Sequence, residues 1–159
     1  IATIAKIGTE EYGLSVGIHA HAAGFIDFEP ELERLLDEVD EKILGICFDT
    51  GHHSYAGFDP VTFMKKHISR INYMHFKDID PKIKASVLAN RTGFYDACGE
   101  GIFCNLGDGN VDFPAVRQLL LDTGFNGWCT VEQDCDPSGN TSPVDDAKLN
   151  RAYLQSIGF

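Results

Sequence analysis

The residues best suited to chemistry stand between positions 46 and 53, where the sequence reads ICFDTGHH. Residues 44–48 form an apolar run typical of a buried strand, and the run stops at Asp49, shortly before His52 and His53. Such polar side chains are costly to bury at the end of an apolar strand unless a partner such as a divalent metal ion satisfies them. Asp49 is therefore the first candidate metal ligand.

Three further stretches end in the same way, with ligand-type side chains after an apolar or alternating run. Residues 14–21 end in His19 and His21, residues 70–78 end in His75, Lys77 and Asp78, and residues 127–134 end in Glu132 and Asp134. In a strand, residues two apart share a face, so the polar groups of each stretch point to the same side. Four separate segments thus carry candidate catalytic or metal-binding groups.

Helices that alternate with these four strands would position the polar groups. Apolar residues at helical spacing predict helices over residues 28–39, from Asp59 and Pro60 to residue 68, over residues 114–121 and over residues 145–157, after a helix tail in residues 1–12. Asp27 is the expected N-cap of the helix over residues 28–39, with Pro30 in its first turn, and Gly124 is expected to end the helix over residues 114–121. This alternation predicts right-handed βαβ units and a parallel sheet, with the reactive groups at the carboxyl ends of the strands.

Residues 80–110 interrupt the alternation. They hold one weak helical piece, residues 83–89, and then a glycine-rich stretch that is too long for an ordinary connection. Long irregular segments of compact domains are usually lids or binding loops. We therefore expect this segment to be an irregular functional loop.

The polar ends of the four strands are suited to one shared metal site. Neighbouring parallel strands lie about 5 Å apart, so groups at their ends can converge on one ion. Two carboxylates with one or two imidazoles suit Mn²⁺, Co²⁺, Fe²⁺ or Zn²⁺ better than Ca²⁺. Taken singly, Asp49 is more often a helix cap, His75 is as often a hydrogen-bonded core histidine, and Lys77 has the alternative of a surface position. The joint pattern favours the metal site.

Composition narrows the class of protein. The chain has 159 residues, of which 43% are hydrophobic and 23% are charged, so we expect one soluble domain over residues 1–159. The net charge of −11 argues against nucleic acid as a partner. The five cysteines include no CxxC pair, which favours reduced thiols over disulfides or structural zinc. No apolar run approaches the ~20 residues of a membrane span, so a cytoplasmic location and no membrane partner are expected. The first residue is Ile, which favours a chain that begins inside a longer protein.

Several motifs resemble the second half of the xylose-isomerase-like TIM barrels, the sugar isomerase and epimerase superfamily. They are DTGH at 49–52, HFKD at 75–78, GDGNVDF at 107–113 and VEQD at 131–134. The His19-x-His21 pair, the long insert after HFKD and TGFYDA at 92–97 are most similar to the inosose dehydratases of inositol catabolism. The resemblance implies an α/β fold of four parallel βα units, which is half of a (β/α)₈ barrel.

The resemblance also implies roles for individual residues. Asp49, His75 and Glu132 match metal ligands, and His19 stands where the epimerase branch has a glutamate, so it is the fourth expected ligand. Mn²⁺ or Co²⁺ is favoured as the ion. The expected catalytic residues are Glu132, His19 or His21 as base, His52 as acid, and Lys77 as the group that stabilises an enolate. The expected substrate-binding residues are His21, His53, Asp78 and Asp108.

The function these residues imply is metal-dependent dehydration of a cyclic polyol ketone, with a polyol or sugar as the small-molecule partner. A sugar isomerase or epimerase with the same metal site is the first alternative, and a non-catalytic half-barrel or assembly module is the second. DNA-repair endonucleases of the superfamily are disfavoured by the acidity of the chain. Four strands leave half of a barrel open, so we expect the missing half, or a second copy of this chain, to complete it.

Overall fold

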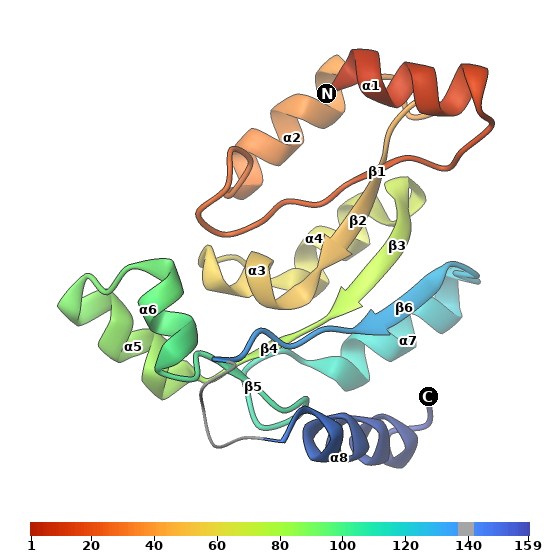
Figure 1. The fold of residues 1–159 in the computed structure, drawn as a ribbon. Coiled ribbons are helices and arrows are strands. Elements are labelled where there is room, and N and C mark those ends of the chain that lie inside the picture. Colours follow the sequence, from red (N-terminus) through yellow and green to blue (C-terminus); the bar gives the residue numbers. More distant parts are fainter. Residues whose placement is uncertain (137–141) are drawn as a thin grey trace.

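A four-stranded parallel sheet forms the centre of the protein in a computed structural model that describes residues 1–136 and 142–159 (Figure 1). Its strands are β1 (Gly17–Ile18), β2 (Gly45–Asp49), β3 (Ile71–Phe76) and β6 (Trp128–Val131), which lie side by side in that order. All three pairings are parallel. The predicted parallel βα architecture is therefore confirmed, although β1 and β6 are shorter than the stretches predicted.

Helices fill the connections between the strands. The chain starts with α1 (Ala2–Lys6) and a π-helical turn, η1 (Ile7–Glu11), and α2 (Glu29–Glu38) connects β1 to β2. Between β2 and β3 lie α3 (Thr50–Tyr55), α4 (Pro60–His67) and a 3₁₀ turn, η2 (Ile68–Arg70). Between β3 and β6 lie β4 (Asp78–Ile79), α5 (Pro81–Asn90), α6 (Phe94–Gly99), β5 (Phe103–Cys104) and α7 (Phe113–Thr123), and α8 (Pro143–Ser156) closes the chain.

Local capping explains where several helices begin and end. The Asp59 carboxylate accepts hydrogen bonds from two backbone N–H groups of the first turn of α4, and Gly124 ends α7 with a φ of 65°. The expected N-cap of α2 was wrong, because Phe28 holds that position and Asp27 instead accepts a hydrogen bond from the Ala23 backbone. The Glu31 carboxylate reaches back to the backbone N–H groups of residues 27 and 28.

Residues 80–110 are more regular than predicted. Asp80 caps α5, and a small cluster of buried apolar side chains joins α5, α6 and the antiparallel pair of β4 and β5. The buried members of this cluster are Ile79, Val87, Ala97, Ile102 and Phe103. In Figure 1, α5 and α6 lie together beyond the carboxyl ends of β2 and β3. The expectation of an irregular loop was therefore wrong for most of this segment.

The two faces of the sheet have different surroundings. On one face, Phe48, Met74 and Phe76 pack against apolar side chains of α2, α4, α7 and α8 in the main core. Because side chains alternate along a strand, Asp49, which follows Phe48, and His75, which stands between Met74 and Phe76, point to the opposite face. No helix among the described residues has both the length and the apolar character needed to cross a membrane.

Candidate metal and active site

Asp49 stands at the junction of β2 and α3, and its two carboxylate oxygens serve different groups. Oδ1 accepts a hydrogen bond of 2.8 Å from the backbone N–H of His52 and so caps α3. Oδ2 points the other way and lies 3.6 Å from His19 Nε2 and 3.6 Å from His75 Nδ1. Asp49 therefore caps a helix, which is the ordinary role of such a residue, and also lies in the predicted cluster of ligand-type side chains.

Strand register brings the histidine and the two carboxylates together. Asp49 and His75 are direct partners in the pairing of β2 with β3. Glu132 follows β6, and its backbone N–H donates to the carbonyl of Phe76 at the end of β3. As a result, ligand atoms of Asp49, His75 and Glu132 all lie within 4.8 Å of one another.

Three atoms at the centre of this cluster are buried without a hydrogen-bond partner: His19 Nε2, Asp49 Oδ2 and His75 Nδ1. Glu132 Oε2 lies 2.7 Å from His75 Nδ1, but the contact lacks hydrogen-bond geometry. Unpartnered buried polar atoms are unfavourable unless something else satisfies them. Two ligands of a tetrahedral zinc ion are about 3.4 Å apart, since each lies about 2.1 Å from the metal. The separations of 3.6 Å fit a cation bound between these atoms.

Lys77 lies beside the cluster and is fully buried. Its Nζ donates hydrogen bonds to Glu132 Oε1 at 2.7 Å, to Asp134 Oδ2 at 2.9 Å and to His52 Nε2 at 3.0 Å. The stem of Lys77 passes over α3 at Gly51, where an added Cβ would lie 2.5 Å from Lys77 Cγ. The absence of a side chain at Gly51 therefore gives the lysine its route to the carboxylates.

The pKa values of the buried groups follow from these contacts. Burial raises the pKa of Asp49, but His19, His75 and Lys77 lower it further than burial raises it, so the net pKa lies below the usual range. For Lys77, burial alone lowers the pKa, and the carboxylates of Asp49, Glu132 and Asp134 more than reverse this. The site therefore holds the ionised Asp49 carboxylate beside the charged Lys77 ammonium group.

The pKa values of His52 and His75 shift in opposite directions. Burial lowers the pKa of His52 to about 3, so this imidazole is neutral at neutral pH and accepts a hydrogen bond from Lys77. The pKa of His75 is raised, mainly by Asp49. His21 places its ring 3.8 Å from the ring of His52, centroid to centroid, and its Nδ1 lies 2.7 Å from the carbonyl of Ala22.

The remaining predicted substrate-binding residues, His53, Asp78 and Asp108, do not touch the cluster. His53 is buried beside the ring of Phe63, with Nε2 3.1 Å from Glu29 of α2. Asp78 is fully buried, and its carboxylate accepts hydrogen bonds from four backbone N–H groups, at residues 79, 107, 109 and 111. Asp108 is exposed in the same loop. The structure does not bring these three side chains into contact with the cluster, and their binding roles stay predictions.

Three further residues touch the cluster: Asp134, which the sequence placed at the end of its strand without assigning it a role, and Cys47 and Phe103, which the sequence did not predict. Asp134 binds Lys77, the Sγ of Cys47 lies 3.7 Å from His75 Nε2, and Lys77 Nζ lies 4.8 Å from the centre of the Phe103 ring. Strand alternation could have found Cys47, which is two residues before Asp49, in the same way that it placed Asp134 two residues after Glu132. Phe103 reaches the site through β5, which no pattern predicted.

A parallel sheet with a polar, metal-compatible cluster at the carboxyl ends of its strands is the arrangement found at the active-site end of an α/β barrel. The chain belongs to the xylose isomerase-like TIM barrel family, whose family model matches residues 1–157. The predicted family resemblance is thereby confirmed.

Two curated relatives are similar along most of this chain. The "Rhizopine catabolism protein MocC" of Rhizobium meliloti is 35% identical over 144 residues, which is 91% of this chain and 44% of that protein. The "Inosose dehydratase" of Clostridium botulinum strain Alaska E43 is 32% identical over 143 residues, which is 90% of this chain and 48% of that protein. The chain thus spans about half the length of the curated relatives it matches.

Solved structures support the same fold. A probable 3-DHS dehydratase, AsbF from Bacillus anthracis, matches with a TM-score of 0.71 and 21% identity, covering 99% of this chain and 54% of that one. The IolI protein with a binding zinc atom matches with a TM-score of 0.68 and 15% identity, covering 97% of this chain and 53% of that one. The four-stranded sheet is therefore half of a TIM barrel.

Proposed function

We propose that this chain supplies the metal-binding half of a barrel enzyme that dehydrates a cyclic polyol ketone. The observation that carries the proposal is the meeting of His19 Nε2, Asp49 Oδ2 and His75 Nδ1, all buried and without hydrogen bonds. The choice of dehydration over other sugar chemistry rests on relatives named inosose dehydratase at 32% identity. Because the chain spans about half of those relatives, the proposal concerns the completed barrel.

Asp49, His75 and Glu132, with His19 as a fourth ligand, would hold the divalent ion. A bound divalent ion acts as a Lewis acid at a carbonyl oxygen and makes the neighbouring C–H group more acidic. Mn²⁺ or Co²⁺ suits this mixed oxygen and nitrogen set, and the zinc atom of the IolI neighbour supports a divalent ion in general.

The side chains around the ligands would divide the proton transfers between them. Glu132 or His19 takes the proton from the carbon next to the carbonyl. The electron pair of that C–H bond forms a C=C bond to the following carbon, and the C–O bond of the hydroxyl group on that following carbon breaks. The departing hydroxyl group takes a proton and leaves as water. We assign that proton to Lys77, because its ammonium is charged whereas His52 is neutral and accepts a hydrogen bond from it. Sequence alone had given this acid role to His52.

The test uses the completed protein that contains this chain, a divalent metal and a cyclic polyol ketone. We expect Asp49→Ala or Glu132→Ala to lower turnover at least about 100-fold, since each removes a carboxylate from the metal site. Unaltered turnover in either variant would contradict the proposal. The product separates dehydration from the alternative, because an isomerase or epimerase product keeps the mass of the substrate whereas dehydration removes one water.

A further inference from the structure

Ligand-type side chains form a second group beside the expected metal ligands. One atom from each of its three members lies within 4.8 Å of the others, and the members are His21, His52 and Asp134. The rings of His21 and His52 are 3.8 Å apart, centroid to centroid, and His52 Nε2 lies 4.0 Å from Asp134 Oδ2. Two imidazoles with one carboxylate are side chains that bind Mn²⁺, Co²⁺ or Zn²⁺. The types of these three side chains therefore suit a second divalent ion.

The Lys77 ammonium lies where that ion would bind. Its Nζ donates hydrogen bonds of 3.0 Å to His52 Nε2 and of 2.9 Å to Asp134 Oδ2, two members of the second group. It also donates at 2.7 Å to Glu132 Oε1 and lies 3.5 Å from Asp49 Oδ2, so it borders the expected metal ligands as well. A positively charged group of the chain itself therefore already contacts the acceptors of the second group.

The spacing of the second group fits an ammonium better than a metal ion. A hydrogen bond from an ammonium to a carboxylate is about 2.8 Å long. Zinc lies about 2.1 Å from its nitrogen and oxygen ligands, which places two of them about 3.4 Å apart. The 4.0 Å between His52 Nε2 and Asp134 Oδ2 exceeds this distance, whereas the 3.6 Å between Asp49 Oδ2 and His75 Nδ1 is close to it. The two groups are therefore spaced for different cations.

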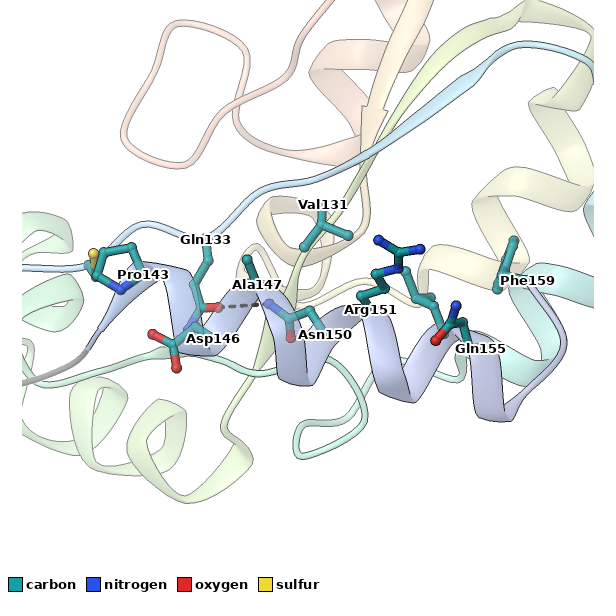
Figure 2. Close-up of a pocket in the computed structure, with 11 residues that line it drawn as sticks. Val131, Gln133, Pro143, Asp146, Ala147, Asn150, Arg151, Gln155 and Phe159 are labelled. Atoms are coloured by element: carbon teal, nitrogen blue, oxygen red, sulfur yellow. Dashed lines mark hydrogen bonds between the residues drawn. The ribbon is translucent and has the colours of Figure 1, made fainter.

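A contact on the other side of the sheet holds Asp134 in place. Gln133 stands between Glu132 and Asp134 in the chain. Its Oε1 accepts a hydrogen bond of 3.1 Å from Asn150 of α8, and Figure 2 shows its side chain directed towards this helix. Asn150 is itself buried. Because neighbouring residues of an extended segment point to opposite sides, this contact directs both carboxylates towards Lys77.

The charges of the site balance with Lys77 and a single divalent ion. The carboxyl groups of Asp49, Glu132 and Asp134 surround the ammonium and carry three negative charges when ionised. The ammonium and one divalent ion together carry three positive charges. A second divalent ion would leave an excess of positive charge and would lie beside the ammonium, which is strongly unfavourable in a buried site.

We propose that the Lys77 ammonium takes the place of a second metal ion, so that the site binds one divalent ion. His21, His52 and Asp134 then form a second metal site that opens only when the ammonium is removed. The lysine thereby supplies a proton donor where a site with two metals would hold another Lewis acid. This inference rests on the proposed function, which supplies the first ion.

The test counts the ions bound by the completed protein that contains this chain. The protein is freed of metal with a chelator, loaded with excess Mn²⁺ and separated from unbound ion. Elemental analysis then gives the number of bound ions, and electron paramagnetic resonance shows whether they are close enough to couple. Lys77→Met removes the ammonium and keeps a side chain that can follow the same path over α3. We expect this variant to bind one Mn²⁺ more than the parent protein and to give the spectrum of two coupled ions.

Two further variants locate the additional ion. Lys84→Met is the matched control, because Lys84 is also partly buried but its ammonium donates to the carbonyl of Ser54 and, within the described part of the chain, forms no ion pair. This control should bind the same number of ions as the parent protein. Lys77→Met combined with Asp134→Asn should lose the additional ion, because the second group then lacks its carboxylate.

Several results would overturn the inference. They are two coupled ions in the parent protein, no additional ion in Lys77→Met with unchanged circular dichroism, and an additional ion that persists with Asp134→Asn. If the methionine variant does not fold, Lys77→Gln, which is also uncharged, carries the same expectation. One ion in the parent and in every variant would overturn this inference alone, whereas no ion in any of them would contradict the proposed function as well.

Discussion

At the scale of single residues, Asp49 determines the geometry of the site. Its Oδ1 is fixed by the N–H of His52, so the direction of Oδ2 is set before any ligand binds. Oδ2 has no hydrogen-bond partner, and the side chain is fully buried between two imidazoles and the Lys77 ammonium. An ionised carboxylate in such a place is poised to bind a cation.

Asp49→Asn separates the two roles of this residue. Asparagine keeps an oxygen that can cap α3, but it removes the negative charge from the cluster. We expect affinity for Mn²⁺ or Co²⁺ to fall at least about 100-fold. This loss is larger than the one caused by removing a residue that only hydrogen-bonds a metal ligand. Isothermal titration calorimetry measures the change, and Asp122→Asn, an exposed carboxylate on α7, serves as the control. Equal affinity of the two variants would remove Asp49 from the ligand set.

At the scale of elements, the loop after β5 depends on a single buried side chain. Three of the four backbone N–H groups that donate to Asp78, those of residues 107, 109 and 111, hold this loop against β4. Gly109 makes this approach possible, since an added Cβ would lie 2.2 Å from Asp78 Oδ1 and 2.5 Å from the Ile79 carbonyl. The loop therefore has no room for a side chain at this position.

Gly109→Ala tests that arrangement. The methyl group would displace the Asp78 carboxylate or the backbone, so we expect a loss of about 2 kcal/mol in the free energy of unfolding. Gly99→Ala is the matched control, because nothing lies within 4 Å of a Cβ added there. Its effect should stay within about 0.5 kcal/mol. Urea denaturation compares the two, and a similar loss in both would show that the loop accommodates the methyl group.

The contact of α3 with α2 predicts a dependence of stability on pH. Burial lowers the pKa of His53 to about 4, against 6.5 for an ordinary histidine. Between these values the unfolded chain binds a proton that the folded chain does not, so stability falls as the pH is lowered from 6.5 towards 4. The slope from this one group is at most about 1.4 kcal/mol per pH unit.

His53→Gln isolates this contribution. Glutamine keeps a hydrogen-bond donor for Glu29 but does not titrate, so the difference between the two proteins cancels the other groups. We expect the free energy of unfolding of the variant to fall less steeply between pH 6.5 and 5. Parallel stability profiles would mean that the folded and unfolded chains hold the His53 proton equally well.

Sequence patterns predicted the longer elements and missed the shortest. Clear apolar periodicity with Asp59 or Gly124 at the ends gave α4 and α7 close to their observed bounds. Helix α3 was missed because its six residues, TGHHSY, have no apolar stripe. Its stability comes from the Asp49 cap and from tertiary contacts, and neither leaves a periodic pattern.

At the scale of the whole molecule, the candidate site was predictable because parallel sheets collect the carboxyl ends of their strands at one edge. Asp49, His75 and Glu132 converge although they are separated by 26 and 57 residues in the chain (75 − 49 and 132 − 75). The contacts of Lys77 with His52 and Phe103 were not predictable, because they depend on where α3 and β5 pack.

The convergence of strands predicts that metal stabilises the entire fold. The expected ligands lie at the carboxyl ends of all four strands of the sheet, so an ion binds only when the sheet is formed. At a concentration 100 times its Kd, Mn²⁺ or Co²⁺ should raise the free energy of unfolding by about 2.7 kcal/mol. Urea denaturation with and without the ion measures this, with Asp49→Asn as the control. An equal gain in the control would place the ion elsewhere.

Position 51 has room for a hydrogen atom and for nothing larger. The stem of Lys77 fills the space where any other residue would carry its Cβ, so even alanine would push the lysine out of line with Glu132 and Asp134. A saturation library at this codon, selected for protein that folds and is active, should return only glycine codons. The smallest residue of the DTGH motif would then be its least replaceable.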